Sequence, residues 1–336
     1  AIITSNKNPL HLILSNDTIM KPPYDITPNI LHQITAISEK LGAIKARFLI
    51  KPSPQLRKQN RVKTIHASLQ IEGNTLTEEQ ITALIENKRV MGPEKDIQEV
   101  SNAIEVYEEI KSYKCLSENS FLKAHKDLMT GLIDNPGKYR KQGVAIVKGK
   151  KLEHLAPPHA NVPHLMKDLF NYLKNDSDPA LIKSCVFHYE LEFIHPFLDG
   201  NGRMGRLWQT FILMQQYPVF EFLPFETLIK ESQKKYYNAL ALSDKLGKST
   251  PFIEYMLEVI EKSLDPLLND NTRILKDSDR LEYFLGLNIK SFSRKDYMNT
   301  FKDISSATAS RDLKKGVEMK LFQSVGDKNK TQYHIK

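Results

Sequence analysis

The stretch HPFLDGNGRMGR at residues 195–206 decides the fold, because it separates two helical patterns in the middle of the chain. Apolar residues repeat at helical spacing from Val186 to Phe193, and Pro196 ends that pattern. A second apolar pattern begins at Leu207. We therefore expect a loop that joins two helices.

The glycines and arginines of this loop indicate a phosphate site. Glycines at 200, 202 and 205 allow positive φ and close approach of the backbone to a ligand, and the N–H groups of the following helix favour an anion. Arg203 and Arg206 are spaced i, i+3, so both guanidinium groups face the same side, where they suit phosphate oxygens. Stability alone would not select arginine at the positive end of a helix.

Two further residues of the loop add a metal ligand and a base. Mg²⁺ prefers one or two carboxylates together with phosphate oxygens, and Asp199 lies beside the predicted phosphate site. His195 lies four residues earlier and can take a proton from a hydroxyl near neutral pH. The loop therefore predicts a nucleotide, a metal and a general base in one place.

Other ligand motifs fit this stretch less well. The glycines satisfy G-x-G-x-x-G, and Glu221 follows about twenty residues later, but a dinucleotide fingerprint requires a buried strand where this sequence has a helical pattern and Pro196. A Walker A loop needs Gly-Lys-Ser/Thr, and a calcium loop starting at Asp199 lacks its glycine and glutamate. A zinc site from His188, His195 and Asp199 matches no standard ligand spacing.

The composition is that of a globular chain. Of the 336 residues, 40% are hydrophobic and 26% are charged, which indicates neither disorder nor a fibrous repeat. Cys115 and Cys185 lie far apart, and we expect buried thiols without a disulfide in a reducing compartment. Neither a secretory leader pattern nor an apolar run of about eighteen residues occurs, so we expect a cytoplasmic protein without a membrane partner.

Most periodic segments predict helices. In residues 60–71, Val62, Ile65 and Leu69 fall on one face, with Gly73 as the C-terminal cap. Thr77 and Gln80 form a capping box for the next helix. The exception is VAIVKGKKLEHLAPP, starting at Val144, which predicts a short hairpin followed by a loop. Residues 263–277 lose the helical rhythm and are expected to be a linker.

The C-terminal part carries much of the positive charge. The net charge of the chain is +8, and residues 278–336 hold twelve Lys and Arg against seven Asp and Glu. The order there is a helix, a short turn, a second helix from about Ser306 and a hairpin around Gly326 to Lys330. Ser310, Arg311, Lys314 and Lys315 would lie on the second helix, and Lys328 and Lys330 on the hairpin. Such a basic face suits DNA, although modules of this kind equally serve protein contacts.

The opening stretch matches the H-x-F-x-[DE]-G-N-G-R-x-x-R motif and resembles the Fic family. The resemblance covers residues 45–262 and includes SLQIEGN at 68–74 and the predicted hairpin. It implies a mostly α fold, with a helical core and a small hairpin called the flap, and the C-terminal part resembles a winged helix. The implied domains are an N-terminal helical region at 1–90, a Fic core at 91–262, the linker at 263–277 and a winged-helix domain at 278–336.

The resemblance implies transfer of AMP from ATP to a hydroxyl of a target protein, with Mg²⁺ as cofactor. His195 would be the general base, Phe197 would fix the loop from the core, and Asp199 would hold the metal. The phosphates would be bound by Gly200, Asn201, Gly202, Arg203 and Arg206. The flap residues Val144, Ile146 and Val147 would pair with an extended target segment, although their pattern alone is typical of an ordinary edge hairpin.

SLQIEG fits the [ST]-x-x-x-E-[GN] inhibitory motif of the family. By this resemblance, Ser68 and Glu72 belong to an inhibitory helix at the N-terminal side of the core, and Glu72 pairs with Arg206 in the space that the γ-phosphate needs. Taken alone, an acid at the end of a helix would be expected to face solvent. In some family members the same glutamate serves removal of AMP.

Three functions are therefore open. The leading one is an autoinhibited protein adenylyltransferase, a nucleotidyltransferase that modifies a target protein or itself. The second is a DNA-binding regulator whose Fic core senses a nucleotide. The third keeps the enzyme but has it also remove AMP or use another donor, since relatives transfer UMP, phosphate or phosphocholine. The resemblance leaves the target, the activating signal and a homodimer open.

Overall fold

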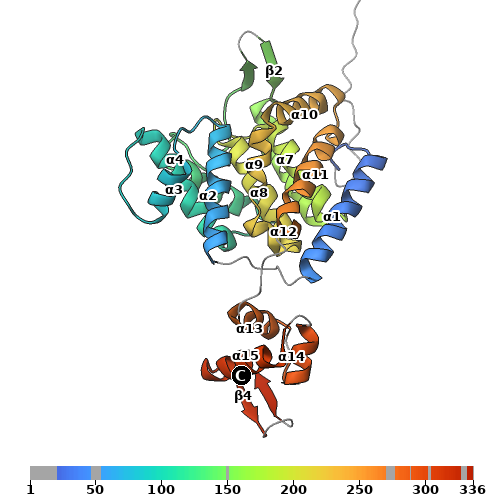
Figure 1. The fold of residues 1–336 in the computed structure, drawn as a ribbon. Helices are drawn as coiled ribbons and strands as arrows, with labels where there is room; N and C mark the ends of the chain where they lie inside the picture. The colour runs from blue at the N-terminus through green and yellow to red at the C-terminus, as the bar shows by residue number, and fades with distance from the viewer. Residues whose placement is uncertain are drawn as a thin grey trace, which may run out of the picture. The chain divides into compact units, whose positions relative to one another are not determined.

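The computed structural model describes residues 21–46, 54–148, 151–269, 277–287, 289–301, 304–326 and 331–335. The chain divides into two compact units, one up to Leu268 and one from Asn269 onward. Helices dominate both units (Figure 1), so the predicted mostly α fold class is confirmed. Among the helices of the described part, none combines the length and the apolar character that a membrane span requires.

The first unit holds twelve α-helices within its described residues, three 3-10 turns and one hairpin. In chain order these are α1 (Pro28–Ala46), α2 (Pro54–Ile71), α3 (Glu78–Ile85), α4 (Glu94–Glu108), η1 (Ile110–Ser112), α5 (Glu118–Met129), β1 (Ala145–Lys148), β2 (Lys151–Leu155), η2 (His159–Asn161), α6 (Val162–Asn175), α7 (Ala180–Ile194), α8 (Asn201–Gln216), η3 (Pro218–Phe222), α9 (Phe225–Glu231), α10 (Gln233–Leu246), α11 (Thr250–Ser263) and α12 (Asp265–Asn269).

The centre of this unit is the antiparallel pair α7 and α8, which the loop at 195–200 joins as predicted. Helix α8 also packs against α2 and η3, and it lies near the middle of this unit in the view of Figure 1. Trp208 is fully buried on α8, and the Phe121 ring of α5 meets it edge-on with centroids 5.1 Å apart. Edge-to-face rings of this kind add to the apolar burial that holds the core. Cys115 and Cys185 are both buried free thiols.

Helix α2 forms as its sequence predicts. Val62, Ile65 and Leu69 are all buried, at 4%, 0% and 2% exposure. The helix ends in a Schellman turn, in which the Asn74 N–H donates to the Leu69 carbonyl at 3.1 Å and Gly73 adopts a φ of +95°. This turn places Glu72 at the very end of the helix. The capping box of Thr77 and Gln80 that starts α3 is also confirmed.

The hairpin predicted from Val144 onward is present as β1 and β2, which pair antiparallel. Ile146 pairs with His154 and Val147 with Leu152, and the register shifts between Ile146 and Val147. A bulge of this kind twists a hairpin locally. The Ala156 N–H donates to the Val144 carbonyl at 3.3 Å, which extends the pairing beyond the strands.

The second unit contains α13 (Asp277–Leu285), β3 (Ser291–Ser293), α14 (Arg294–Thr300), α15 (Ser306–Glu318), β4 (Phe322–Val325) and β5 (Gln332–Ile335). The strands form an antiparallel sheet in the order β3-β5-β4. Arg280 and Asp312 form a buried two-bond pair at 2.6 and 2.9 Å, which ties α13 to α15. Gly316 permits the close packing of α15, because a Cβ there would lie 2.1 Å from the Phe322 ring.

One expectation about the C-terminal part needs correction. Helix α12 continues the helical structure to Asn269, so the first half of the predicted linker at 263–277 is helical, while residues 270–276 lie outside the described part. Gly316 lies inside α15, which runs to Glu318. Lys328 and Lys330 lie outside the described residues.

Candidate active site

A cavity of about 320 Å³ opens above the loop between α7 and α8. It brings together residues from four segments: Glu72 at the end of α2; Glu192 of α7; His195, Leu198, Asp199, Gly200, Asn201, Gly202 and Arg206 of the loop and α8; and Tyr236, Tyr237, Leu240, Ala241 and Asp244 of α10. Most of the predicted site residues therefore line one cavity. Its α10 side is partly apolar, and its loop side carries charge.

The loop is held by the side chain of Asn201. Its amide oxygen accepts the Phe197 N–H and its amide nitrogen donates to the Phe197 carbonyl, both at 2.9 Å. Asn201 is only 2% exposed, so the side-chain amide closes the loop, and a contact of this residue with a ligand is left to its backbone N–H. Gly200 caps α8 with a φ of +86°, a conformation that favours glycine.

His125 of α5 supports the loop from below. Its Nδ1 atom accepts the Gly137 N–H at 2.9 Å, so Nε2 carries the proton and donates to the Asp199 carbonyl at 3.0 Å. Burial lowers the pKa of His125 to about 4, which keeps the ring neutral. Phe197 is fully buried, as the sequence analysis expected of this position.

Glycine is required at each of the three positions for a different structural reason. Gly200 alone of the three needs a positive φ, whereas Gly202 and Gly205 are helical. A Cβ on Gly202 would lie 2.5 Å from Oε1 of Glu72. A Cβ on Gly205 would lie 2.5 Å from the His188 ring, so this glycine lets α7 and α8 pack closely. The expectation that all three glycines serve backbone approach to a ligand is therefore wrong for Gly205.

His195 ends α7 in the left-handed conformation, with φ +48° and ψ +60°. Such a backbone is uncommon for a residue with a Cβ and is worth about 1–2 kcal/mol of strain. The surrounding structure must hold it in place. The buried side chain of Arg140 donates to the carbonyl groups of Ile194 and His195, and the Arg140 backbone N–H donates to the carbonyl group of Pro196.

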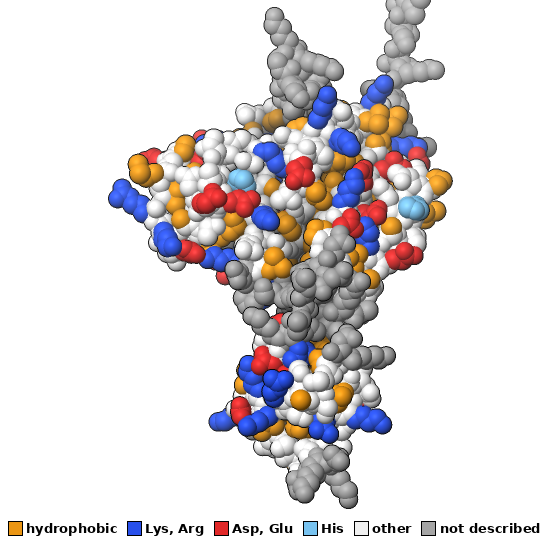
Figure 2. All heavy atoms as spheres, viewed as in Figure 1, with side chains coloured by type: hydrophobic (Ala, Val, Ile, Leu, Met, Phe, Trp, Pro, Cys, Tyr) orange, Lys and Arg blue, Asp and Glu red, His pale blue; other side chains and the backbone are white. Residues whose placement is uncertain are grey.

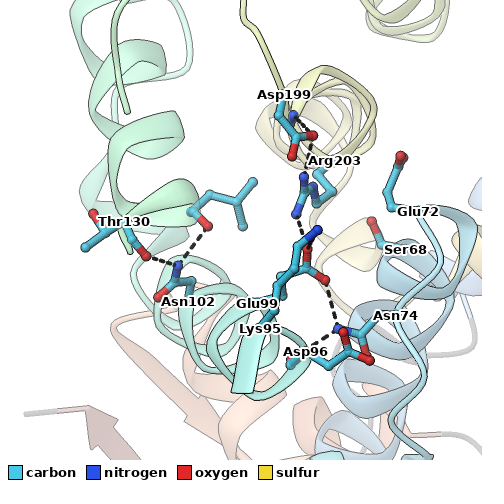
Figure 3. A network of polar contacts seen from close by, with 12 residues as sticks. Ser68, Glu72, Asn74, Lys95, Asp96, Glu99, Asn102, Thr130, Asp199 and Arg203 are labelled. Atoms are coloured by element: carbon cyan, nitrogen blue, oxygen red, sulfur yellow. Dashed lines mark hydrogen bonds and ion pairs between the residues drawn. The ribbon is translucent and has the colours of Figure 1, made fainter. Parts of the chain in front are cut away.

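Arg203 lies between Asp199 and Glu99 of α4 (Figure 3). One guanidinium nitrogen donates to Asp199 Oδ1 at 2.7 Å and another to Glu99 Oε1 at 3.2 Å. Glu99 in turn accepts a bond from the Asn74 amide at 2.9 Å. The network links the metal-ligand candidate Asp199 to the segment that follows Glu72. Arg203 is 4% exposed and, unlike Arg206, is not among the residues that line the cavity.

Arg206 is bound to the end of α2. Its Nε donates to the Ser68 hydroxyl at 3.0 Å, and one terminal nitrogen donates to the Ser68 carbonyl at 2.9 Å and to Glu72 Oε1 at 2.6 Å. Burial disfavours the charge of this 1% exposed side chain, but Glu72, together with Tyr236 and Glu192, more than offsets burial and raises the pKa of Arg206. The carboxylate also lies over Gly202 in the first turn of α8, where a helix favours an anion.

The donor set around Asp199 fits Mg²⁺ better than a metal held by protein alone. No group of three or more His, Cys, Asp or Glu side chains in the described part is arranged to hold a metal. The Asp199 side chain is 46% exposed and lines the cavity, with Oδ1 engaged by Arg203 and by the Gly200 N–H. One exposed carboxylate beside the predicted phosphate site would suit Mg²⁺, which prefers one or two carboxylates together with phosphate oxygens.

Comparison with known proteins agrees with this site. The model of the Fic/DOC family matches residues 115–213, which include α7, the loop and all but the last turn of α8. The crystal structure of a Fic family protein from Desulfovibrio desulfuricans is 38% identical and matches with a TM-score of 0.71, over 94% of this chain and 98% of that chain. The chain belongs to the Fic family. This Fic protein matches that structure across both of its units.

Curated relatives of this Fic protein carry functional names. "Protein adenylyltransferase Fic" of Drosophila melanogaster is 27% identical over 245 residues, which are 69% of this chain and 45% of that protein. "Protein adenylyltransferase fic-1" of Caenorhabditis briggsae is 29% identical over 214 residues, 60% of this chain and 40% of that protein. The Fic protein thus spans less than half the length of these relatives.

Several residues of the site were missed by the sequence analysis. His125 and Arg140 lie outside the loop and carry no periodic signal, although GKYR directly before the hairpin is a compact polar cluster. Glu99 lies on a helix where an acid is expected to face solvent. Tyr237 and Leu240 belong to the helical pattern of α10. A residue's place in the cavity depends on packing between distant segments, which no local pattern reports.

Proposed function

We propose that this Fic protein is an autoinhibited protein adenylyltransferase, which transfers AMP from ATP to a Ser, Thr or Tyr hydroxyl of a target protein. One observation carries the proposal: the cavity that holds His195 and Asp199 also holds an ion pair of 2.6 Å between Arg206 and Glu72. A base, a metal ligand and a phosphate-binding arginine are the parts that nucleotidyl transfer requires.

In this reaction the acceptor hydroxyl oxygen forms a bond to the α-phosphorus, and the bond from that phosphorus to the β-phosphate oxygen breaks. Pyrophosphate leaves, and His195 accepts the hydroxyl proton. The N–H groups at the start of α8 and the Arg206 guanidinium stabilise charge on the leaving group. Mg²⁺ held by Asp199 would neutralise phosphate charge. On the α10 side of the cavity, Leu240 and Ala241 offer apolar surface for the adenine ring.

Glu72 opposes this arrangement in the inhibited state. Its carboxylate uses the guanidinium nitrogen that would bind an outer phosphate, and it lies against Gly202 at the helix start. A γ-phosphate brought to the same place would meet a like charge and would lose its arginine. We infer that ATP binds in an unproductive pose until Glu72 moves. Ser68 supports the inhibited state because it fixes the same arginine through two bonds.

Intact-mass spectrometry after incubation with ATP and Mg²⁺ tests the proposal on three proteins: wild type, Glu72→Gly, and Glu72→Gly with His195→Ala. We expect only the single variant to gain the mass of AMP, on itself or on an added target. An adduct on wild type at the same level would contradict autoinhibition, and an adduct on the double variant would contradict the base. Tight nucleotide binding without any adduct from ATP or other donors would favour the regulator.

The hairpin is proposed to hold the target. An extended segment of the target would pair with the edge of β1, at Val144, Ile146 and Val147, so that its hydroxyl reaches the cavity. Backbone pairing depends little on target sequence. The position of the hairpin directly after the Arg140 segment, which contacts the His195 loop, supports this assignment.

We further propose that residues 278–336 form a winged-helix domain that binds DNA through α15. The order of α13, β3, α14, α15, β4 and β5 with the sheet order β3-β5-β4 supports the fold. On the visible face of this unit, Lys and Arg side chains cover more of the surface than Asp and Glu side chains do (Figure 2). Arg311 and Lys314 are exposed on α15, whereas Lys315 is engaged by Asp277 at 2.7 Å.

Fluorescence anisotropy with a labelled duplex tests this second proposal. We expect binding to weaken steeply with salt, and the Arg311→Ala, Lys314→Ala variant to bind more weakly with a smaller salt slope. Lys320→Ala, exposed in the same unit but beyond α15, is the control. Equal binding by all three proteins, or none by wild type, would leave the domain as a protein-contact module.

A further inference from the structure

Arg140 makes an unusual set of contacts for a buried arginine. Its side chain is 3% exposed, and all four of its acceptors are backbone carbonyl oxygens. Nε donates to His195 at 2.8 Å, one terminal nitrogen donates to Gln142 at 2.8 Å, and the other donates to Pro157 at 2.6 Å and to Ile194 at 3.2 Å. The Arg140 N–H adds a bond to the Pro196 carbonyl at 2.9 Å.

Three of these bonds fix the end of α7. The last carbonyl groups of a helix lack partners within the helix and form its negative end, which a cation stabilises. Arg140 supplies donors to the carbonyl groups of Ile194, His195 and Pro196, which are three consecutive residues. The middle one is the residue in the left-handed conformation. Arg140 therefore holds the backbone on both sides of the strained histidine.

The other two bonds fix the base of the hairpin. Gln142 lies just before β1 and Pro157 just after β2, so their carbonyl groups mark where the chain enters and leaves the hairpin. One planar guanidinium thus connects both ends of the hairpin to the His195 carbonyl. An arginine fork has the fixed geometry for this task, whereas a lysine has a single nitrogen and cannot reach all these acceptors in one orientation.

We propose that Arg140 is a positioning residue, which sets the distance between the His195 imidazole and an acceptor hydroxyl held on the hairpin. The inference rests on the proposed transferase function. A misplacement of about 1 Å can cost about 100-fold in rate. A contact that fixes both the His195 imidazole and the acceptor hydroxyl therefore affects the turnover rate more strongly than it affects nucleotide binding. Arg140 does not line the cavity proposed for ATP, so we expect nucleotide binding to depend little on it.

The kinetic test uses Glu72→Gly as the background, with Arg140→Lys and Arg140→Ala added separately. Lys141→Ala is the matched control, since Lys141 is the exposed neighbour in the same segment. We expect Arg140→Lys to lower kcat for AMP transfer by about 100-fold, with KM for ATP within about threefold of the background. Guanidinium ion at millimolar concentration should partly restore kcat in Arg140→Ala but not in Arg140→Lys. A folded Arg140→Lys protein with unchanged kcat overturns the proposal.

A second measurement does not depend on activity. In protein with ¹³C-labelled histidine, the Cα resonance of His195, assigned by its loss in His195→Ala, reports the left-handed backbone. We expect this resonance to move in Arg140→Lys and to stay in Lys141→Ala; an unmoved resonance would overturn the inference. If Glu72→Gly transfers no AMP, the transferase proposal fails, and the resonance alone decides whether Arg140 positions His195. If Arg140→Ala does not fold, Arg140→Lys carries both tests.

Discussion

The imidazole ring of His125 lies flat on the phenyl ring of Phe197, with ring centroids 3.5 Å apart and planes inclined by 7°. The two residues come from α5 and from the loop after α7. Their contact joins the apolar core to the chain between His195 and Asp199. The stack, together with the bond from His125 to the Asp199 carbonyl, makes a neutral buried histidine part of the loop's support.

This histidine makes the stability of the protein depend on pH. The pKa of His125 is lowered to about 4 in the folded state, against an ordinary value of 6.5, so the unfolded chain binds a proton first as the pH falls. The stabilisation is complete above pH 6.5 and is lost between there and pH 4, to an extent on the order of 3 kcal/mol. We expect urea unfolding at several pH values to show that the unfolding free energy of His125→Gln depends less steeply on pH than that of wild type.

His188 contributes in the same direction, because burial lowers its pKa to about 3, so His125→Gln removes only part of the slope. His32→Gln, at an exposed position of α1, serves as control and should keep the wild-type dependence of the unfolding free energy on pH. If the unfolding free energies of His125→Gln and wild type depended equally on pH, the His125 ring would not be a source of this pH dependence.

Replacing Glu72 by Gln should make the protein less stable but more responsive to nucleotide. The buried Arg206 loses its counter-charge, which costs roughly 1–3 kcal/mol because Glu72 is itself 31% exposed. Arg206 also becomes available to phosphates. In thermal unfolding we expect a lower Tm without ligand and a larger rise with ATP and Mg²⁺ than in wild type. Glu105→Gln, exposed on α4, should change neither value.

Asp199→Asn tests the metal ligand. In the Glu72→Gly background we expect the Mg²⁺ concentration for half-maximal AMP transfer to rise at least about tenfold, since even residues that only orient a metal ligand contribute 10- to 100-fold in affinity. The stability change should be small because this carboxylate is 46% exposed. Asp134→Asn, exposed in the segment after α5, is the control. An unchanged Mg²⁺ requirement would remove Asp199 as the ligand.

Asn201→Asp should weaken the loop although it changes only one group. The variant retains an acceptor for the Phe197 N–H but places a second oxygen against the Phe197 carbonyl, which leaves that carbonyl without its donor. We expect the free energy of unfolding to fall by about 1–3 kcal/mol. Chemical denaturation measures this, with Asn238→Asp on the exposed face of α10 as control. Equal losses in both variants would argue against the loop-closing role.

Gly205→Ala should destabilise through packing alone. The added methyl group would lie 2.5 Å from the fully buried His188 ring, and overpacking of this kind costs about 1–3 kcal/mol. Gly42→Ala is the matched control, because it is also a helical glycine but has no atom within 4 Å of the new methyl group. There we expect a gain of up to about 1 kcal/mol. Similar effects at both positions would contradict the packing explanation.

The sequence predicts well what depends on neighbours along the chain. The loop between two helices, the buried face of α2, the Gly73 cap and the Thr77 capping box all follow from local spacing, and the structure confirms them. The contact of Glu72 with Arg206 spans 134 positions and was available only through family resemblance. Its local pattern indicates a solvated helix end.

The remaining parts of the site depend on packing between distant segments. His125 and Arg140 reach the loop from 74 and 55 positions away. From the motif alone, Asn201 and Gly205 would both be assigned to ligand binding. In the structure, the side chain of Asn201 closes the loop, and the missing Cβ of Gly205 allows α7 and α8 to pack closely. The family motif therefore mixes residues for chemistry with residues for packing, and only contacts in three dimensions separate them.

The Schellman turn at the end of α2 limits how inhibition can be relieved. Val62, Ile65 and Leu69 anchor the body of the same helix in the core, so withdrawing the whole helix would unfold much of the unit. Glu72 lies beyond these anchors, next to the glycine in the left-handed conformation. Under the proposed autoinhibition, an activating partner would therefore need only to rotate the last peptide units around Gly73, a local movement that leaves the core intact and can be reversed without refolding.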